Sequence, residues 1–233
     1  MTLRGVTRLS SYPGLMPLTV EIWSDVVCPW CYLGKRRFEA ALERFEHRDE
    51  VTVLWRSFEL DPEASRDVVG TAAERLAGKF GMSLERALQL HAEMEERAAA
   101  EGLEYHLGET KGGNSFDAHR MIHLAATYGH QAAAQERFFR AYFTEGESIG
   151  VWDTLVRLVG EVGVDEAEAR EALRLNRFAE EVREDEALAQ QFGIQGVPFF
   201  VFDRRYGLSG AQPAETMLAA LERAWAEAVN MQA

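Results

Sequence analysis

Cysteine is scarce in this sequence. The 233 residues include two cysteines, Cys28 and Cys31, with two residues between them. A structural disulfide stabilises mainly by closing a long loop of the unfolded chain, and this pair would close a very short one. Because 47% of the residues are hydrophobic, the chain can bury a substantial core without covalent cross-links. The spacing therefore argues against a disulfide framework and predicts that the two thiols carry out chemistry.

Long apolar runs and an excess of positive charge are also missing. No run reaches the ~20 residues needed to span a bilayer. The first 17 residues lack the apolar stretch of a secretory signal, so we expect a flexible leader at 1–17 and a cytoplasmic protein. The formal net charge of −13 disfavours nucleic acid and anionic membrane surfaces as partners.

Strand patterns occur only near the two ends of the sequence. Residues 18–23 alternate apolar and polar side chains, and residues 51–58 are rich in β-branched and aromatic side chains. The residues between these two segments have the apolar spacing of a helix. Two further strands are predicted at 198–202 and 206–209, and Pro213 is expected to open a final helix.

The segment from residue 63 to residue 189 is predicted to be helical. Ser83 is expected to cap one of its helices. The predicted buried face of that helix contains Leu84, Ala87, Leu88 and either His91 or Ala92. Without this segment the element order is that of a minimal thioredoxin domain. We therefore predict an α/β protein in which 18–62 and 190–230 form a thioredoxin-like domain, with 63–189 inserted as an all-helical domain between the second and third strands.

The sequence Cys28-Pro29-Trp30-Cys31 follows the first predicted strand and opens a helix. Proline suits the first helical position, which makes Cys28 the N-cap residue. Its sulfur then faces free backbone N–H groups at the positive end of the helix dipole, which favours the thiolate. Cys31 lies inside the first turn and is expected to be less exposed. Cys28 is therefore predicted to attack and Cys31 to resolve the mixed disulfide, with Pro29 and the uncharged Trp30 tuning the pair.

A zinc site is the main alternative for the cysteine pair, since this spacing also supplies half of a tetrahedral site. His119 and His123, four residues apart on a predicted helix, would provide the other two ligands. The strand–cysteine pair–helix context with proline after the first cysteine favours redox chemistry, and no metal is predicted. Two inert buried thiols are the remaining possibility.

Several segments form a recognisable set. They are Trp23–Gly34 (WSDVVCPWCYLG), Phe58–Pro62 (FELDP), Asn114–Arg120 (NSFDAHR), Gly196–Phe202 (GVPFFVF) and Ser209–Gln212 (SGAQ). Together they resemble the DsbA-like thioredoxin superfamily, and within it the FrnE branch. The resemblance implies a cis peptide between Val197 and Pro198 facing the cysteine pair. It also implies that substrate binds around Val197, Pro198 and the exposed ring of Trp30.

Three polar residues are predicted to support the site. Asp25 is expected either to take part in proton transfer near Cys31 or to order the loop before it. By the resemblance, Asn114 and His119 lie where the helical domain meets the active site, and the alternative for their segment is a capped helix between domains.

The predicted function is dithiol–disulfide exchange on protein substrates, as an oxidoreductase or isomerase. No metal or nucleotide cofactor is implied, and glutathione or a thioredoxin-like protein is the expected electron partner. In the cytosol we expect reduction or isomerisation rather than net oxidation. One alternative is a glutathione-dependent isomerase of the kappa transferase and hydroxychromene-carboxylate isomerase group, which typically has serine where Cys28 stands. Another is a non-catalytic chaperone.

Overall fold

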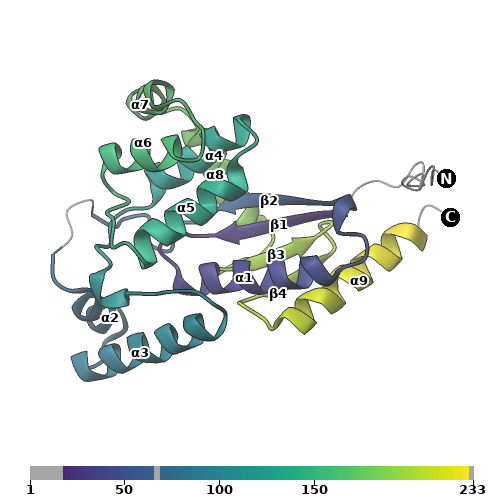
Figure 1. Ribbon diagram of the computed structural model, residues 1–233, viewed down its shortest axis with the longest axis horizontal. Helices are drawn as coiled ribbons and strands as arrows, with labels where there is room; N and C mark the ends of the chain where they lie inside the picture. Colours follow the sequence, from purple (N-terminus) through teal and green to yellow (C-terminus); the bar gives the residue numbers. More distant parts are fainter. Residues whose placement is uncertain (1–17, 66–68, 231–233) are drawn as a thin grey trace, which may run out of the picture.

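Four strands form one mixed sheet in the order β2-β1-β3-β4 (Figure 1). The strands are β1 (Leu18–Ser24), β2 (Val51–Ser57), β3 (Phe199–Phe202) and β4 (Tyr206–Ser209). β1 runs parallel to β2 and antiparallel to β3, and β3 and β4 form a hairpin. The computed structural model describes residues 18–65 and 69–230, so the predicted leader at 1–17 lies outside the described residues. The four strands match the sequence prediction to within a residue or two.

Two helices cover one face of the sheet, α1 (Pro29–Arg44) and α9 (Ala214–Asn230). The alternation in β1 turns Leu18, Val20 and Ile22 toward these helices, where all three are fully buried. The ring of Phe38 in α1 packs on Phe200 of β3, with 5.6 Å between the ring centroids. This apolar layer is the core of the sheet region.

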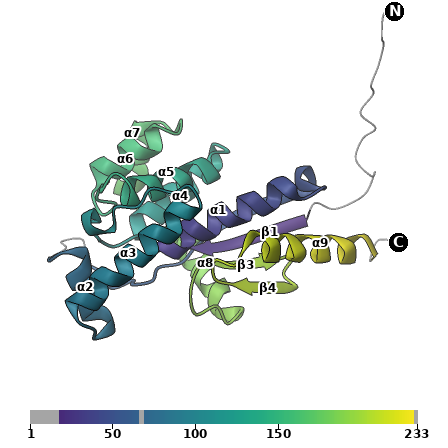
Figure 2. The same cartoon turned by 60° about the horizontal axis from the view of Figure 1, so that its bottom comes forward.

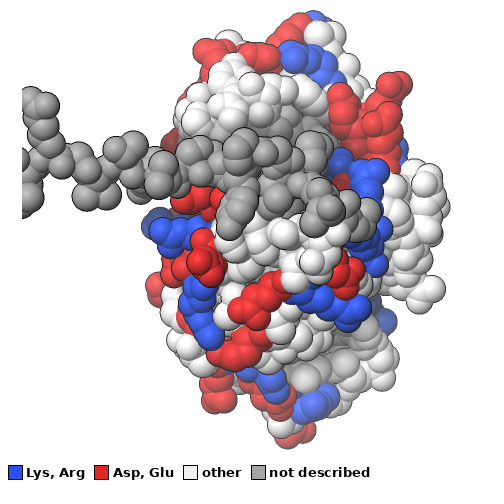
Figure 3. Space-filling model, turned by 90° about the vertical axis from the view of Figure 1, so that its right-hand side faces the viewer, with Lys and Arg blue, Asp and Glu red and all other residues white. Residues whose placement is uncertain are grey.

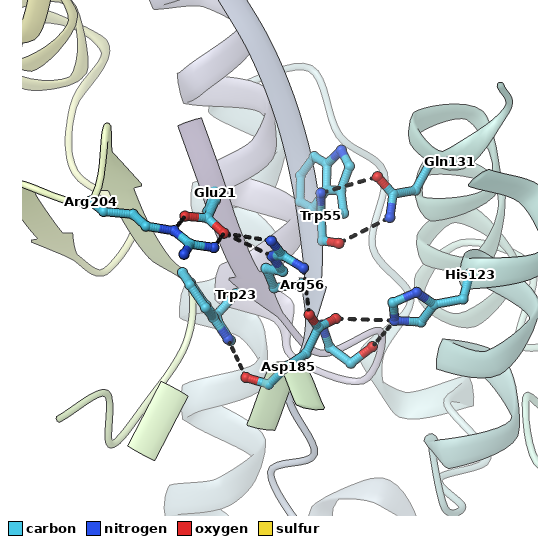
Figure 4. A network of polar contacts seen from close by, with 9 residues as sticks. Glu21, Trp23, Trp55, Arg56, His123, Gln131, Asp185 and Arg204 are labelled. Carbon is cyan, nitrogen blue, oxygen red and sulfur yellow. Dashed lines mark hydrogen bonds and ion pairs between the residues drawn. The ribbon is translucent and has the colours of Figure 1, made fainter. Parts of the chain in front are cut away.

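The opposite face of the sheet packs against the helical segment through an apolar cluster that includes Trp23 and Val201 and through a buried polar network. Glu21 of β1 is buried and accepts hydrogen bonds from Arg56 and Arg204, at 2.6 and 2.7 Å (Figure 4). Burial raises the pKa of the Glu21 carboxyl, but the two arginines outweigh it and hold the pKa below its ordinary value. Arg56 also donates to Asp185 at 2.9 Å, which links the sheet to the helices.

Asp185 lies on α8 (Ala179–Gln191) and is itself buried. Its carboxylate accepts from the backbone N–H of Ser57 at 2.9 Å and lies 3.0 Å from His123 of α4, while its backbone carbonyl accepts from the Trp23 indole at 2.8 Å. Gln131 of α5 pairs with the backbone of Trp55 on the outer strand β2 (Figure 4). The helices thus occupy the open edge of β2, which would otherwise present unpaired backbone groups.

All the helices between β2 and β3 belong to the inserted segment. They are α2 (Ala72–Phe80), α3 (Leu84–Ala100), α4 (Phe116–Thr127), α5 (Gln131–Phe143), α6 (Trp152–Gly160), α7 (Glu166–Arg174) and α8, with a short 3₁₀ turn at Leu107–Glu109. Another 3₁₀ turn, Arg48–Glu50, lies between α1 and β2. Figures 1 and 2 show α2 and α3 as a hairpin apart from α4–α7, near the start of α1. α8 continues past residue 189, the predicted end of the insertion. Within the described residues, no helix is long and apolar enough to cross a bilayer.

The predicted buried face of α3 is wrong in part. Ser83 caps the helix as expected, since its hydroxyl accepts from the Arg86 N–H at 3.2 Å. Leu84 and Leu88, however, are 46% and 54% exposed, and the buried side chains are Ala87, Met94 and Ala98. α3 is covered on one side only, and the small alanines let that side approach its neighbours most closely. Propensity and spacing do not show which side this is.

Charge of one sign does not gather on the face shown in Figure 3. Basic and acidic side chains lie among uncharged ones over the part of this face that the structure describes. This distribution is that of a well-solvated surface, in keeping with the interspersed charges of the sequence.

We expect Asp185→Ala to lower the free energy of unfolding by about 3–5 kcal/mol, because it leaves the buried Ser57 N–H without its acceptor and removes one of the two carboxylates that pair with Arg56. The matched control is Asp153→Ala, which removes an exposed ion pair with Arg170 and should change stability by less than about 1 kcal/mol. Urea unfolding measures both. Similar losses in the two variants would contradict the role given to Asp185.

Candidate active site

The two cysteines lie where β1 passes into α1. The helix begins at Pro29 with Cys28 as its N-cap residue, and the Cys28 side chain makes no capping hydrogen bond. Both thiols are free, and Cys28 and Cys31 are 4% and 1% exposed. The predicted N-cap position and the order of exposure are confirmed. Cys28 therefore holds its sulfur at the positive end of a 16-residue helix.

The environment of Cys31 favours the protonated thiol. Burial raises the pKa of the Cys31 thiol well above its ordinary value, and the neighbouring Cys28 raises it further. The Ser24 hydroxyl and the Asp25 backbone oppose this shift without overcoming it. Cys31 is consequently a thiol at neutral pH and has to lose its proton before it can attack.

The segment before β3 closes over the cysteine pair. The peptide between Val197 and Pro198 is cis, as the family resemblance implied. The Cys28 thiol donates a hydrogen bond to the Val197 carbonyl, with 3.5 Å between sulfur and oxygen. Pro198 packs on Gly34 of α1, where an added Cβ would lie 2.8 Å from the Pro198 Cγ. The start of α1 and the segment before β3, which are far apart in the sequence, thus meet at the Cys28 sulfur.

Trp30 is the exposed member of the motif, with 40% of its surface accessible. The Arg97 guanidinium of α3 lies 5.8 Å from the centroid of its indole, so a positive charge stands over the ring. Tyr105, from the loop after α3, donates to the Pro29 carbonyl at 2.8 Å. The sequence prediction included the exposed Trp30 but missed Arg97 and Tyr105, because nothing in their spacing points to the motif.

Asp25 and His119 form a buried polar pair behind the motif. The Asp25 carboxylate accepts from the Leu60 N–H at 2.7 Å and lies 3.4 Å from the His119 Nε2, and its backbone carbonyl accepts from the Cys28 N–H at 3.0 Å. Both side chains are almost fully buried. Asp25 orders the loop before the motif, and its backbone hydrogen-bonds Cys31, while the proton-transfer role stays a prediction.

The imidazole of His119 faces three carboxylates, those of Asp25, Glu59 and Glu186. Burial lowers the pKa of His119, but the hydrogen bond and charge of Asp25 and the charges of the two glutamates outweigh it and raise the pKa above its ordinary value. Burial also raises the pKa of Glu59, although Arg183 and His119 lower it. The cysteine motif therefore lies beside a largely buried cluster of oppositely charged side chains.

Asn114 joins this cluster from the loop before α4. Its amide donates to Glu59 at 3.3 Å, and its Oδ1 accepts from the Phe116 N–H at 2.9 Å. Asn114 thus provides the side-chain bond to the start of α4, while Ser115 at the N-cap position makes none. The segment lies next to the cysteine motif, as the family resemblance implied. A side chain also bonds the start of its helix, as the capped-helix alternative expected, but that side chain belongs to Asn114.

The four residues of the alternative zinc site are not brought together. His123 lies 3.1 Å from the Ser57 hydroxyl and 3.0 Å from Asp185, at the end of β2. The residues that the structure describes contain no group of three or more His, Cys, Asp or Glu side chains arranged to hold a metal ion. The cysteine pair therefore has to be understood through its own chemistry.

Gly34→Ala should lower the free energy of unfolding by about 1–3 kcal/mol, because the new methyl group forces Pro198 away from α1. Gly78→Ala in α2 is the matched control: its Cβ meets nothing within 4 Å, and alanine should stabilise a helix there by about 0.5–1 kcal/mol. Urea unfolding measures both. A Gly34→Ala protein as stable as the parent would show that Pro198 is not held at this position.

His119→Gln tests the buried pair through pH. Because the pKa of His119 is raised in the folded protein, its stabilising contribution is complete below the unfolded value of about 6.5 and is lost as pH rises through the folded value. The difference in unfolding free energy between parent and variant should thus be larger at about pH 5.5 than at about pH 9. The exposed His130→Gln is the control. A difference that does not change with pH would argue against a charged His119.

Comparison with known proteins agrees with this geometry. The family model of the DSBA-like thioredoxin domain matches residues 19–222. The crystal structure of a probable DsbA oxidoreductase from Streptomyces coelicolor is 47% identical, with a TM-score of 0.87, over 90% of this chain and 91% of that one.

Two more distant structures share the fold. The cytosolic disulfide reductase DsbM from Pseudomonas aeruginosa, solved with GSH, is 24% identical over 88% of this chain and 98% of its own, with a TM-score of 0.60. A 2-hydroxychromene-2-carboxylate isomerase is 19% identical over 91% and 98%, with a TM-score of 0.68. The fold is therefore the thioredoxin-like fold of the DsbA proteins, and the chain belongs to the family of DSBA-like thioredoxin domains.

Proposed function

We propose that this protein catalyses thiol–disulfide exchange on protein substrates through Cys28 and Cys31. The observation that carries the proposal is the position of the Cys28 sulfur, at the N-terminus of α1 and 3.5 Å from the Val197 carbonyl. Membership of the DsbA-like family supports a thiol–disulfide oxidoreductase in general. The exposed Trp30 and the segment before Pro198 flank the sulfur on two sides, where a substrate chain would lie.

The reaction proceeds in two displacements. The Cys28 thiolate attacks one sulfur of a substrate disulfide, forms a mixed disulfide and releases the other substrate sulfur as a thiolate. Cys31 then loses its proton and attacks the Cys28 sulfur, which forms the Cys28–Cys31 disulfide and releases the second substrate thiolate. The substrate gains two electrons and the protein loses two. The reverse sequence oxidises a substrate dithiol.

The two thiols differ in a way that suits these roles. Cys28 lies at the N-terminus of α1, where free N–H groups and the helix dipole suit an attacking sulfur, while burial keeps Cys31 protonated until the mixed disulfide forms. We assign Asp25 and His119 a supporting part in this proton loss, since the Asp25 backbone hydrogen-bonds Cys31 and His119 lies 3.4 Å from the Asp25 carboxylate. Pro29 and Trp30 set the start of the helix and the exposed side of the site.

We place the reaction in the cytoplasm, in the direction of reduction or isomerisation, with glutathione or a thioredoxin-like protein as the electron partner. The likeness in fold to a cytosolic disulfide reductase solved with GSH supports this direction. The glutathione-dependent isomerase alternative is less well supported, because it needs no second thiol and Cys31 lies directly behind Cys28. A FrnE-type protein remains our assignment within the family.

Cys31→Ser should accumulate mixed disulfides with protein substrates, because the resolving thiol is gone while Cys28 still attacks. Cys28→Ser is the matched control and should accumulate almost none. Non-reducing electrophoresis after acid quenching measures both, with reduction by dithiothreitol as the check. If both variants trap substrate equally, the assignment of the two thiols is wrong. If the parent protein shows no exchange and Cys28→Ser still binds unfolded chains with full holdase activity, the chaperone alternative is supported.

A further inference from the structure

Ser24 and Gln135 form a buried polar pair next to the cysteine motif. Ser24 is the last residue of β1 and is 1% exposed, and Gln135 lies on α5 and is 2% exposed. The Gln135 amide donates a hydrogen bond to the Ser24 hydroxyl oxygen, with 3.3 Å between nitrogen and oxygen. Burying two polar side chains is less favourable than burying apolar ones of similar size, so this pair needs an explanation other than filling space.

The backbone fixes the Ser24 hydroxyl beside the cysteine pair. Ser24 pairs with Ser57 in the parallel register of β1 and β2, and its carbonyl accepts from the Phe58 N–H at 3.2 Å. The chain then turns from β1 into α1. This turn brings the sulfur of Cys31, which lies in the first turn of α1, into hydrogen-bonding contact with the Ser24 hydroxyl.

α5 holds Gln135 at this point through contacts one helical turn away on each side. Gln131, one turn earlier, bonds the backbone of β2. Phe139, one turn later, stacks on Tyr32 of α1 with 4.9 Å between the ring centroids. Residues four apart lie on one face of a helix, so Gln135 lies between two contacts that fix this face of α5. The amide is thereby kept directed at Ser24.

The bond from Gln135 leaves the Ser24 hydroxyl hydrogen for Cys31. An amide N–H can only donate, so the Ser24 oxygen accepts in this bond and its own hydrogen is available to another acceptor. A thiolate accepts a hydrogen bond more strongly than a thiol does, because the acceptor is charged. Burial raises the pKa of the Cys31 thiol and Ser24 opposes this rise, so the hydroxyl matters most when the sulfur is charged.

We propose that Ser24 is a further catalytic residue, which stabilises negative charge on the Cys31 sulfur during exchange, and that Gln135 is the residue that positions its hydroxyl. This inference rests on the proposed function of the cysteine pair. Here the hydroxyl only donates a hydrogen bond and keeps its proton.

The step concerned is the opening of the Cys28–Cys31 disulfide by an external thiolate such as that of glutathione. A bond forms between the external sulfur and the Cys28 sulfur, and the bond between Cys28 and Cys31 breaks. The electron pair of the broken bond moves to Cys31, which leaves as a thiolate bonded to Ser24 and then takes a proton from solvent. In the reverse step the same thiolate, again bonded to Ser24, attacks the mixed disulfide on Cys28.

The test is the rate at which dithiothreitol cleaves the Cys28–Cys31 disulfide of the full protein at neutral pH, followed by tryptophan fluorescence in stopped flow. Ser24→Ala should slow cleavage about five- to tenfold, because a thiol without its hydrogen-bond donor is a poorer leaving group. The equilibrium constant with glutathione should stay within about twofold of the parent value, because Cys31 is a neutral thiol in the reduced protein.

Ser57→Ala is the matched control for the loss of a buried hydroxyl. Ser57 pairs with Ser24 in the sheet and is equally buried, but its hydroxyl lies beside His123. This variant should cleave at the parent rate. Ser24→Thr keeps a hydroxyl at the same position and should keep most of the parent rate.

Gln135→Met tests the positioning role and replaces Ser24→Ala if that variant does not fold. Without the amide, the Ser24 hydroxyl can turn away from the sulfur, so cleavage should slow about two- to fourfold. The same substitution made on Ser24→Ala should have no further effect, because no hydroxyl remains to be positioned.

Cleavage by Ser24→Ala and Gln135→Met at the parent rate would overturn this inference and leave the proposed function standing. A slower rate in Ser57→Ala as well, or a change in the equilibrium constant as large as the change in rate, would make Ser24 a structural residue and would also overturn it. If the parent protein exchanges no substrate disulfide although cleavage by dithiothreitol still depends on Ser24, the proposed function fails and the role of Ser24 at Cys31 stands.

Discussion

Pro198 can reach the first helix only because residue 34 has no side chain. An added Cβ there would stand 2.8 Å from the proline ring, closer than carbon atoms approach in folded proteins. This contact holds the segment before β3 against α1 and brings the Val197 carbonyl to the Cys28 thiol. The position of the segment beside Cys28 thus depends on the close packing of Pro198 against Gly34.

Buried charged side chains form two separate groups near this contact. Behind the motif, Asp25 and His119 put a carboxylate and an imidazole next to the loop that carries Cys28. On the face of the sheet opposite α1 and α9, Arg56 bridges Glu21 of β1 and Asp185 of α8. Burying charges is unfavourable unless each is paired, so such networks tolerate little displacement. The inserted helices are therefore held in one position relative to the sheet.

The insertion contributes to the site as well as enclosing it. Tyr105 donates to the Pro29 carbonyl, Arg97 stands over Trp30, and His119 pairs with Asp25. The α2–α3 hairpin also lines a cavity next to Trp30. The thioredoxin-like part carries the cysteine pair, and the insertion contributes these contacts around it.

Much of this protein follows from local patterns in the sequence. The four strands, the start of α1 at Pro29 and the N-cap position of Cys28 depend on alternation, proline geometry and spacing within a few residues. The cis peptide before Pro198 was implied by family resemblance and not by the residues alone. The exposed ring of Trp30 was inferred in the same way.

Tertiary structure alone decided the surroundings of the motif that neither spacing nor resemblance indicated. The buried face of α3 turns Leu84 and Leu88 outward, although their spacing suits burial, because a helix buries whichever side its neighbours cover. Arg97 and Tyr105 contact the motif from positions well over 60 residues away in the chain. Sequence spacing reports on contacts within one helix or strand, whereas these contacts depend on how whole elements pack, and only the folded chain determines that.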